Sequence, residues 1–186
     1  MCFIDFTKAF DMIRHEQLWF RMLKISFPPH LVEILRNLYR QQMAAVRTAG
    51  IVSNWFHIRK GVRQGCVISP CLFNILAEMV MRRVLEGWNG GFKIGGMTIN
   101  NLRYADDIVL IAQSAEELQE LVDRLIREGT KYNLILNASK LNIMTNTAER
   151  MDIKANGTAL EQVTVFQYLD ANITCDGEVR SDIKND

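Results

Sequence analysis

Apolar residues recur at helical spacing in two segments of the first half of the chain. In residues 13–26 the spacing is carried by Leu18, Met22 and Ile25, and the same period returns over residues 31–40. Two consecutive prolines lie between the segments, and proline cannot continue a helix. The pattern therefore predicts two helices with a break between them.

Two further helices are predicted later in the chain, each opened by a serine. Ser69 is the expected N-cap, and Pro70 the first-turn residue, of a helix that ends near Leu85. Ser114 is the expected N-cap of the fourth helix, whose first turn holds two glutamates in the orientation that the helix dipole favours. The apolar stripe of this fourth helix consists of Leu118, Leu121, Val122, Leu125 and Ile126.

Short strand-forming runs separate these helices. Residues 2–6 predict a buried strand that has Asp5 at its end, and residues 102–112 predict two strands joined at 105–107. Other strand candidates are residues 44–48 paired with 51–58 (turning at Gly50 or near Ser53 and Asn54), a hairpin marked by glycines 90–91 and 95–96, residues 134–136, 141–144 and 164–169, and a tight turn at Asn156-Gly157. This irregular mixture predicts an α+β fold with a mainly antiparallel sheet backed by helices.

Composition sets limits on the class of protein. With 48% hydrophobic and 23% charged residues, the 186-residue chain can bury one core. The opening residues resemble no signal peptide, and the most apolar stretch, residues 66–81, is interrupted by polar residues. The four cysteines form no CxxC pair and have no histidine at ligand spacing. We therefore expect a reduced, intracellular protein, in the nucleus or cytoplasm, that has no structural zinc and no membrane contact.

The formal net charge of +1 conceals an asymmetry along the chain. Residues 1–101 hold 13 Lys/Arg against 6 Asp/Glu, and no acidic residue occurs between Glu33 and Glu78. This acid-free interval interleaves basic side chains with aromatic ones, a pattern that suits a phosphate backbone with stacked bases. A solvated basic face would give the same pattern. The interval contains Arg36, Arg40, Arg47, Arg59, Lys60 and Arg63, with Tyr39, Trp55, Phe56 and Phe73 among them.

Three aspartates are the candidate metal-binding residues of the chain. Asp5 ends the first strand, and Asp106 and Asp107 lie at the turn of a hairpin. If the hairpin lies beside the first strand, the three carboxylates converge and repel one another, a conflict that bound divalent cations remove. Oxygen ligands of this kind suit Mg²⁺, and two such ions can support an in-line phosphoryl displacement. Adjacent aspartates are, however, also common turn-formers.

Four segments in order resemble the motifs A, B, C and D of reverse transcriptases. They are "FIDFTKAFD" (3–11), "GVRQGCVISPCLFN" (61–74), "YADD" (104–107) and "LILNASK" (134–140). The residues of these motifs are similar to those of non-LTR (LINE-type) retrotransposon polymerases, in particular the RTE/BovB group. The resemblance covers nearly the whole chain. A fifth segment, "FQYLDANIT" (166–174), is similar to the primer-grip region of the family, with Asp170 in place of the usual glycine.

The resemblance implies a role for each matching residue. Asp5, Asp106 and Asp107 would hold two Mg²⁺ ions (Mn²⁺ being possible), and Lys140 would protonate the leaving pyrophosphate. Phe10 would exclude a ribose 2′-hydroxyl and so favour dNTP over NTP, which argues against an RNA-dependent RNA polymerase. The remaining assignments are Ala9, Gln64 and Gly65 at the dNTP, Arg63, Tyr168 and Leu169 at nucleic acid, and a structural role for Asp11 and His15.

The expected protein is thus a partial reverse transcriptase domain over residues 1–186. It would comprise a palm with part of the fingers, with the N-terminal fingers, thumb and endonuclease absent. The expected reaction is addition of a dNTP to a DNA primer 3′-hydroxyl on an RNA template, weak or undetectable for this chain alone. The alternative is a degenerate or co-opted copy that binds nucleic acid without catalysis. Asn133 and Leu141, which replace an expected glycine and threonine, agree with relaxed selection. The sequence does not indicate an oligomeric state.

Overall fold

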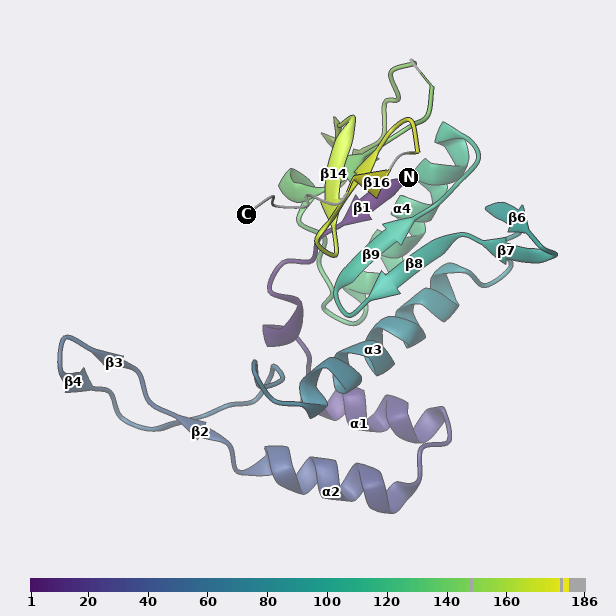
Figure 1. Cartoon of the computed structure of the whole chain (residues 1–186). Coiled ribbons are helices and arrows are strands. Elements are labelled where there is room, and N and C mark those ends of the chain that lie inside the picture. Colours follow the sequence, from purple (N-terminus) through teal and green to yellow (C-terminus); the bar gives the residue numbers. More distant parts are fainter. Residues whose placement is uncertain (148, 178, 181–186) are drawn as a thin grey trace.

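A five-stranded sheet forms the centre of the computed structural model, which describes residues 1–147, 149–177 and 179–180 (Figure 1). The strand order is β13-β10-β1-β9-β8, and every neighbouring pair is antiparallel except β10 with β13. The predicted α+β fold with a mainly antiparallel sheet is therefore confirmed. The five strands are β1 (Cys2–Ile4), β8 (Asn101–Tyr104), β9 (Asp107–Leu110), β10 (Asn142–Ile143) and β13 (Glu161–Gln162).

Strand β1 is buried along its whole length because it has a partner strand on each side and apolar cover on both faces. Since side chains alternate across a strand, Cys2 and Ile4 join the main core while Phe3 joins a second cluster with Val109 and Met144. A continuous apolar run is therefore the expected sequence for this position. The second cluster lies under a separate antiparallel sheet of β14 (Val165–Tyr168), β15 (Ala171–Thr174) and β16 (Val179–Arg180).

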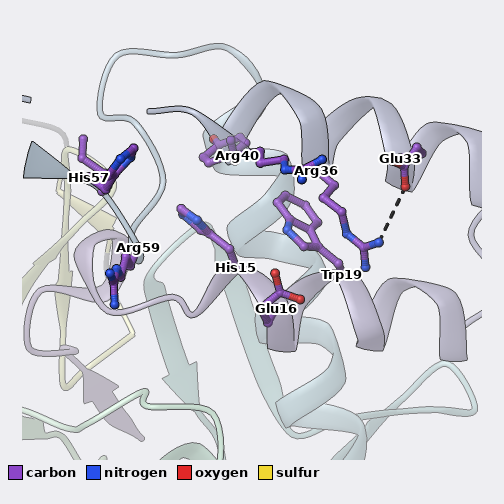
Figure 2. A pocket seen from close by; sticks show the side chains of 10 residues that line it. His15, Glu16, Trp19, Glu33, Arg36, Arg40, His57 and Arg59 are labelled. Carbon is purple, nitrogen blue, oxygen red and sulfur yellow. Dashed lines mark ion pairs between the residues drawn. The ribbon is translucent and has the colours of Figure 1, made fainter. Parts of the chain in front are cut away.

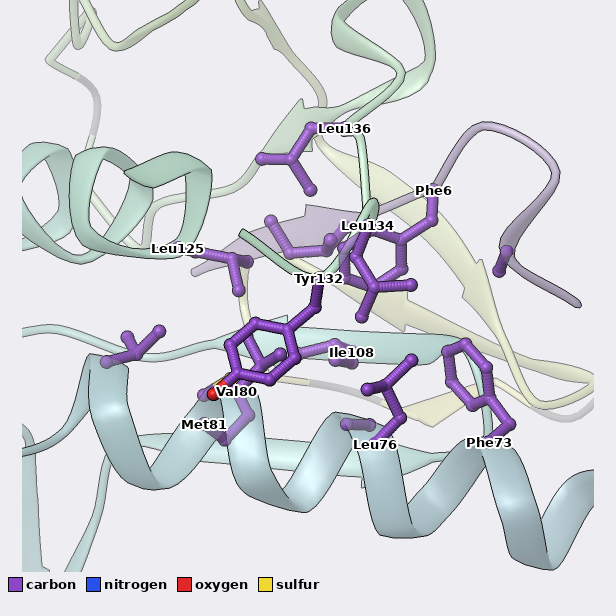
Figure 3. Close-up of a cluster of buried hydrophobic side chains, with 14 of the residues drawn as sticks. Phe6, Phe73, Leu76, Val80, Met81, Ile108, Leu125, Tyr132, Leu134 and Leu136 are labelled. Atoms are coloured by element: carbon purple, nitrogen blue, oxygen red, sulfur yellow. The ribbon is translucent and has the colours of Figure 1, made fainter. Parts of the chain in front are cut away.

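Helices α3 (Ile68–Val84) and α4 (Ala115–Thr130) pack against each other and cover the main-core face of the sheet. Figure 3 shows Phe73, Leu76 and Val80 of α3 facing the strand that carries Ile108. Ser114 caps α4 as predicted, since its hydroxyl accepts a 3.2 Å hydrogen bond from the Glu117 N–H. The sequence therefore located this helix start correctly.

The predicted N-cap of α3 is wrong by two residues. Val67 is the N-cap residue, and Ser69 lies inside the helix, where it is buried and its hydroxyl lacks a hydrogen-bond partner among the described residues. The Ser69 N–H already bonds the Cys66 carbonyl at 3.1 Å, so a turn precedes the serine and its side chain is not needed as a cap. Pro70 does lie in the first turn, as predicted.

The other large part of the molecule consists of α1 (His15–Lys24), α2 (Pro29–Arg40) and a long two-stranded arm that extends away from both helices (Figure 1). The arm pairs β2 (Met43–Ala44) with β5 (Phe56–His57), and β3 (Arg47–Thr48) with β4 (Ile51–Val52). Its tip turns at Ala49 and Gly50, which resolves the two alternatives for this hairpin. Arm residues are mostly exposed, whereas Leu18, Trp19 and Met22 of α1 are buried.

Two short hairpins and two short helices complete the described part of the chain. The glycine pairs indeed mark a hairpin, and Asn156 and Gly157, both at positive φ, turn another. Residues 134–136 form no strand; a single antiparallel bridge joins Leu136 to Phe6, which lies two residues beyond the end of β1. The elements are β6 (Phe92–Ile94), β7 (Met97–Ile99), β11 (Lys154–Ala155), β12 (Thr158–Ala159) and the short helices η1 (Ala9–Asp11) and η2 (Ala138–Lys140).

Candidate active site

Strand pairing brings Asp5 and Asp107 face to face. The antiparallel register of β1 and β9 pairs Ile4 with Ile108, so the next position along the ladder places Asp5 opposite Asp107. Asp5 lies on the same side of the sheet as Phe3, two residues earlier, and both aspartates line one pocket. Two carboxylates separated by about a hundred positions in sequence are thus neighbours for a topological reason.

The adjacent turn holds the third carboxylate. Ala105 adopts a left-handed φ of 51°, an uncommon conformation for a residue with a Cβ, and Asp106 follows it before β9 begins. Strain of this kind is frequent at functional sites. Partial burial raises the pKa of Asp107, and the negative charges of Asp106 and Asp5 raise this pKa further. The three aspartates therefore share one electrostatic environment.

Lys140 completes a pocket of about 420 Å³ at the two facing carboxylates. The segment before it is tied to the first strand, because the Asn137 N–H bonds the Asp5 carbonyl at 2.9 Å and the Thr7 N–H bonds the Ile135 carbonyl at 2.8 Å. Because these two hydrogen bonds hold the segment beside the first strand, helix η2 and its residue Lys140 lie next to the carboxylates. The pocket is lined by Phe3, Ile4, Asp5, Asp107, Ser139, Lys140, Asn142 and Phe166.

The β14–β15 hairpin borders the same pocket. The Phe166 ring stacks on Phe3 with centroids 3.8 Å apart, and the Tyr168 hydroxyl donates a 3.4 Å hydrogen bond to the Asp107 carbonyl. Partial burial raises the pKa of Tyr168, and the Asp107 charge adds to the effect. The hairpin turns at Leu169 and Asp170, with φ of 49° and 63°. Asp170 thus occupies the positive-φ position where the family pattern has glycine, and Leu169 is exposed at the tip.

The segments around Phe10 and Gly61 are bound to each other. The Val62 N–H bonds the Phe10 carbonyl at 2.8 Å, and His15 Nε2 donates to the Gly61 carbonyl at 2.6 Å. Gly61 is required here: at φ +90° its backbone passes so close to Asp11 that a Cβ would lie 3.1 Å from the Asp11 Cα and carbonyl oxygen. The structural role predicted for His15 agrees with these contacts.

The predicted nucleotide-binding residues differ in their surroundings. The Phe10 ring is half-buried and stacks on Phe73 with centroids 5.0 Å apart, while Ala9 is buried. Arg63, Gln64 and Gly65 are exposed and do not line the carboxylate pocket. Gly65, at φ +79°, has open space where a Cβ would point. The structure therefore brings Asp5, Asp107, Lys140 and Tyr168 together, and leaves the 63–65 loop facing solvent.

Sequence reasoning missed five pocket residues: Phe3, Ile4, Ser139, Asn142 and Phe166. Ser139 and Asn142 flank Lys140 in sequence, so their proximity to that lysine was a usable signal. Phe166 begins the segment assigned to the primer grip, but only the stacking on Phe3 shows that it contacts β1.

A family model described as reverse transcriptase (RNA-dependent DNA polymerase) matches residues 1–173. The chain belongs to this family. Its α+β architecture is that of a reverse transcriptase palm with fingers elements, in agreement with solved telomerase structures. Telomerase from Candida albicans superposes with a TM-score of 0.69 at 12% identity, covering 97% of this chain and 31% of that one, and telomerase from Candida tropicalis with 0.67 at 15%, covering 100% and 30%.

The curated relatives of this chain are proteins of mobile elements. The Pol polyprotein of the retrotransposable element R2 of Nasonia vitripennis is 33% identical over 122 residues, 66% of this chain and 12% of that protein. The R2DM polyprotein of Drosophila melanogaster is 27% identical over 95% of the chain and 18% of its own length. The jockey polymerase of Drosophila funebris is 28% identical over 90% and 19%. These matches agree with the predicted LINE-type class; the RTE/BovB subtype stays a prediction.

The chain thus spans less than a fifth of the length of these relatives. No helix in the described residues is long and apolar enough to cross a membrane.

The facing carboxylates fit a hard divalent cation. Among the described residues, no three His, Cys, Asp or Glu side chains form a ready-made metal site. Mg²⁺ nevertheless needs only one or two protein carboxylates, because water and substrate phosphates complete its shell. The repulsion that Asp106 and Asp5 exert on Asp107 is also what a bound cation would relieve. The donor set therefore suits Mg²⁺ better than a metal that requires nitrogen or sulfur ligands.

Proposed function

We propose that this reverse transcriptase segment is the palm, with part of the fingers, of an RNA-directed DNA polymerase. The primer 3′-hydroxyl would attack the α-phosphate of a dNTP on an RNA template and release pyrophosphate. The observation that carries the proposal is the placement of Asp5 and Asp107 on facing strands, with Lys140 in the same pocket. Family membership supports the same reaction.

Asp5, Asp106 and Asp107 are the proposed metal-holding residues. Two Mg²⁺ ions, when bound, would activate the attacking hydroxyl and stabilise the leaving oxygen. The carboxylates bind a cation only when they are ionised, and because the pKa of Asp107 is raised, this carboxylate becomes neutral at a pH above the ordinary aspartate range. Mn²⁺ prefers similar oxygen ligands and is an expected substitute.

Lys140 is the proposed general acid for the pyrophosphate. Its ammonium group is exposed at the pocket rim, where it can reach a leaving group held near Asp5 and Asp107. Proton donation from Nζ would neutralise charge as the bond to the leaving oxygen breaks. An ammonium in this position would also attract the triphosphate before reaction.

The remaining assignments concern the nucleotide and the nucleic acid. Phe10, held by its stacking on Phe73, would close the space that a ribose 2′-hydroxyl needs, and the backbone at Ala9 would face the triphosphate. The exposed Gln64 and Gly65 would border the nucleotide, and Arg63 the nucleic acid. Tyr168, bonded to the Asp107 carbonyl, and Leu169 at the hairpin tip would contact the primer.

We also propose that the protein acts in a reducing intracellular compartment without membrane contact. The four cysteines are unpaired, and Cys2 is buried with a thiol pKa raised to about 12, so this thiol stays protonated and unreactive. A non-catalytic, nucleic-acid-binding role would have no use for the shared electrostatics of the three aspartates, and no contact in the site favours it.

Calorimetric titration of the chain with Mg²⁺ and Mn²⁺ tests the proposal directly. Asp106→Asn should remove saturable binding, because it deletes the charge while keeping the size of the side chain. Asp123→Asn, on the surface of α4, is the matched control and should bind like the parent. Equal binding by both variants would contradict the metal site. Mg²⁺-dependent dNTP incorporation at high chain concentration then separates a polymerase from a binding relic.

A further inference from the structure

A second polar pocket lies far from the aspartates, between α1, α2 and the base of the arm. Its volume is about 720 Å³. Figure 2 shows His15 between two groups of basic side chains, with His57 and Arg59 on one side and Arg36 and Arg40 on the other. The pocket is lined by His15, Glu16, Trp19, Glu33, Arg36, Tyr39, Arg40, His57, Ile58 and Arg59.

The arginines of this pocket are poorly neutralised. Arg36 pairs with Glu33 at 3.6 Å, a long and partly exposed contact that contributes little. In the part of the chain that the structure describes, Arg40 and Arg59 make no ion pair and no side-chain hydrogen bond. Guanidinium groups present several donors in a plane and bind phosphate oxygens in pairs. The free groups therefore suit a phosphodiester.

Two buried donors in the wall have no partner within the described residues. They are the hydroxyl of Tyr39, a residue 2% exposed, and Nε of Arg36. The Tyr39 ring is held in place by edge contacts with His15 and Trp19, at centroid distances of 4.9 and 5.6 Å. A buried polar group that has no hydrogen-bond partner destabilises the folded chain. Such groups are tolerated where a ligand or water completes their bonding.

The carboxylate of Glu16 on the pocket wall limits which ligands the pocket can bind. Glu16 lies in the first turn of α1 and faces the same cavity, where it takes part in no ion pair among the described residues (Figure 2). A bare phosphate beside it would be repelled, whereas a ribose hydroxyl would donate to it. The pocket is thus suited to a group that has both a phosphate and hydroxyl donors.

The arm adjoining the pocket offers surfaces for stacking. Trp55 and Phe56 are 68% and 48% exposed, next to His57 of the pocket. Exposed aromatic rings beside basic groups bind successive bases of a single strand without sequence preference. The arm itself lies within the interval that contains no acidic residue between Glu33 and Glu78, and the acidic side chains at the pocket are those of Glu16 and Glu33. A strand lying on the arm would meet the pocket without charge repulsion along the way.

We propose that this pocket binds one ribonucleotide unit of single-stranded RNA, with its phosphate at Arg40 and Arg59, its ribose hydroxyl at Glu16, and neighbouring bases on Trp55 and Phe56. The Tyr39 hydroxyl supplies a further hydrogen bond to the same unit. This site is separate from the carboxylate pocket and requires no metal. It holds RNA whether or not the chain polymerises.

Fluorescence anisotropy with labelled single-stranded RNA of about 12 nucleotides, in EDTA, tests the site on the full chain. The double variant Arg40→Ala/Arg59→Ala should raise the Kd roughly tenfold and reduce the salt dependence by about one phosphate contact. Arg83→Ala removes an exposed arginine on α3 and should bind like the parent. If the double variant binds RNA as Arg83→Ala does, the proposal is overturned.

Tyr39→Phe separates binding from folding. It removes only the unpartnered hydroxyl, so stability should be unchanged or slightly higher, while RNA affinity should fall about threefold. Unchanged affinity in this variant would contradict the Tyr39 contact.

Measuring the affinity for single-stranded DNA of the same sequence tests whether the pocket recognises the ribose 2′-hydroxyl. The parent should bind RNA more tightly than DNA, and Glu16→Ala should reduce this preference. Equal affinity for RNA and DNA in the parent overturns the ribose assignment. Because metal is absent throughout, these outcomes are independent of the Mg²⁺ titration of the aspartates.

Discussion

The pocket at Asp5 and Asp107 draws its walls from segments spread over residues 3–166, whereas the pocket at Arg40 and Arg59 is built by residues 15–59 alone. The first is held by strand pairing in the central sheet and the second by two consecutive helices and a hairpin. The first gathers like charges that need a cation, and the second gathers cations that need a phosphate. Sequence motifs identified the residues of the acidic pocket, whereas the only sequence signal of the basic pocket was the interval of basic residues without acidic ones.

The difference predicts that the two pockets can be disabled separately, and Asp5→Asn is the strongest test. Primer extension by the chain, low to begin with, should fall on the order of a thousandfold because the metal contributes several kcal/mol to the transition state. RNA binding in EDTA should be unchanged. Asp123→Asn is the control for both measurements. A parallel loss of RNA affinity would show that the pockets are coupled.

Substitutions in the packed region should also destabilise the chain far more than substitutions on the exposed arm. Phe73 is 0% exposed and supports the Phe10 ring, so Phe73→Ala should lower the free energy of unfolding by about 3–5 kcal/mol. Trp55→Ala, on the exposed arm, should change it by less than about 0.5 kcal/mol. Urea titration followed by circular dichroism measures both. Similar losses in the two variants would mean that the arm packs on something in solution.

Lys140→Ala should affect turnover without affecting metal. Loss of the proposed general acid should slow dNTP incorporation about a hundredfold, with Mg²⁺ binding and stability close to the parent because the side chain is exposed. Lys140→Arg, which keeps the charge but donates its proton poorly, should restore nucleotide affinity and not the rate. A rate restored by arginine would make Lys140 an electrostatic residue only.

Phe10→Ala should reduce the preference for dNTP over NTP by about tenfold, since a smaller side chain leaves room for the 2′-hydroxyl. The variant also loses the stacking on Phe73, so the ratio of the two incorporation rates, rather than either rate, is the measurement. Leu35→Ala, which also removes a partly buried apolar side chain packed on the core, serves as the control for general destabilisation. An unchanged ratio would remove the gate assignment.

The smallest expected effect concerns Asp107 and pH. Burial, Asp106 and Asp5 raise its pKa in the folded chain, so the folded state holds its proton more tightly than the unfolded state. Stability should therefore fall as the pH rises from the ordinary aspartate range through this raised pKa. Asp107→Asn should flatten that slope and stabilise the chain at neutral pH by less than about 1 kcal/mol, because the carboxylate is largely exposed. Urea unfolding across this pH range tests the sign.

Local signals located most elements correctly. The apolar period and the Ser114 cap defined α4, and the glycine and asparagine turns marked their hairpins, because these features depend on residues a few positions apart. The N-cap predicted at Ser69 is wrong because the helix begins before it, and the Ser69 N–H is bonded to the Cys66 carbonyl in the preceding turn. The strand expected over 134–136 reduced to one bridge, since the length of pairing depends on where its partner ends.

The sequence by itself determined the order of the motifs, the aspartates as candidate ligands, and the acid-free basic interval. The tertiary structure alone decided that Asp5 faces Asp107, that Lys140 and Phe166 share their pocket, and that Arg40 and Arg59 border one cavity. Helical period and turn chemistry are set by neighbours in the chain. Strand register and cavity walls depend on packing between distant segments, which no local pattern encodes.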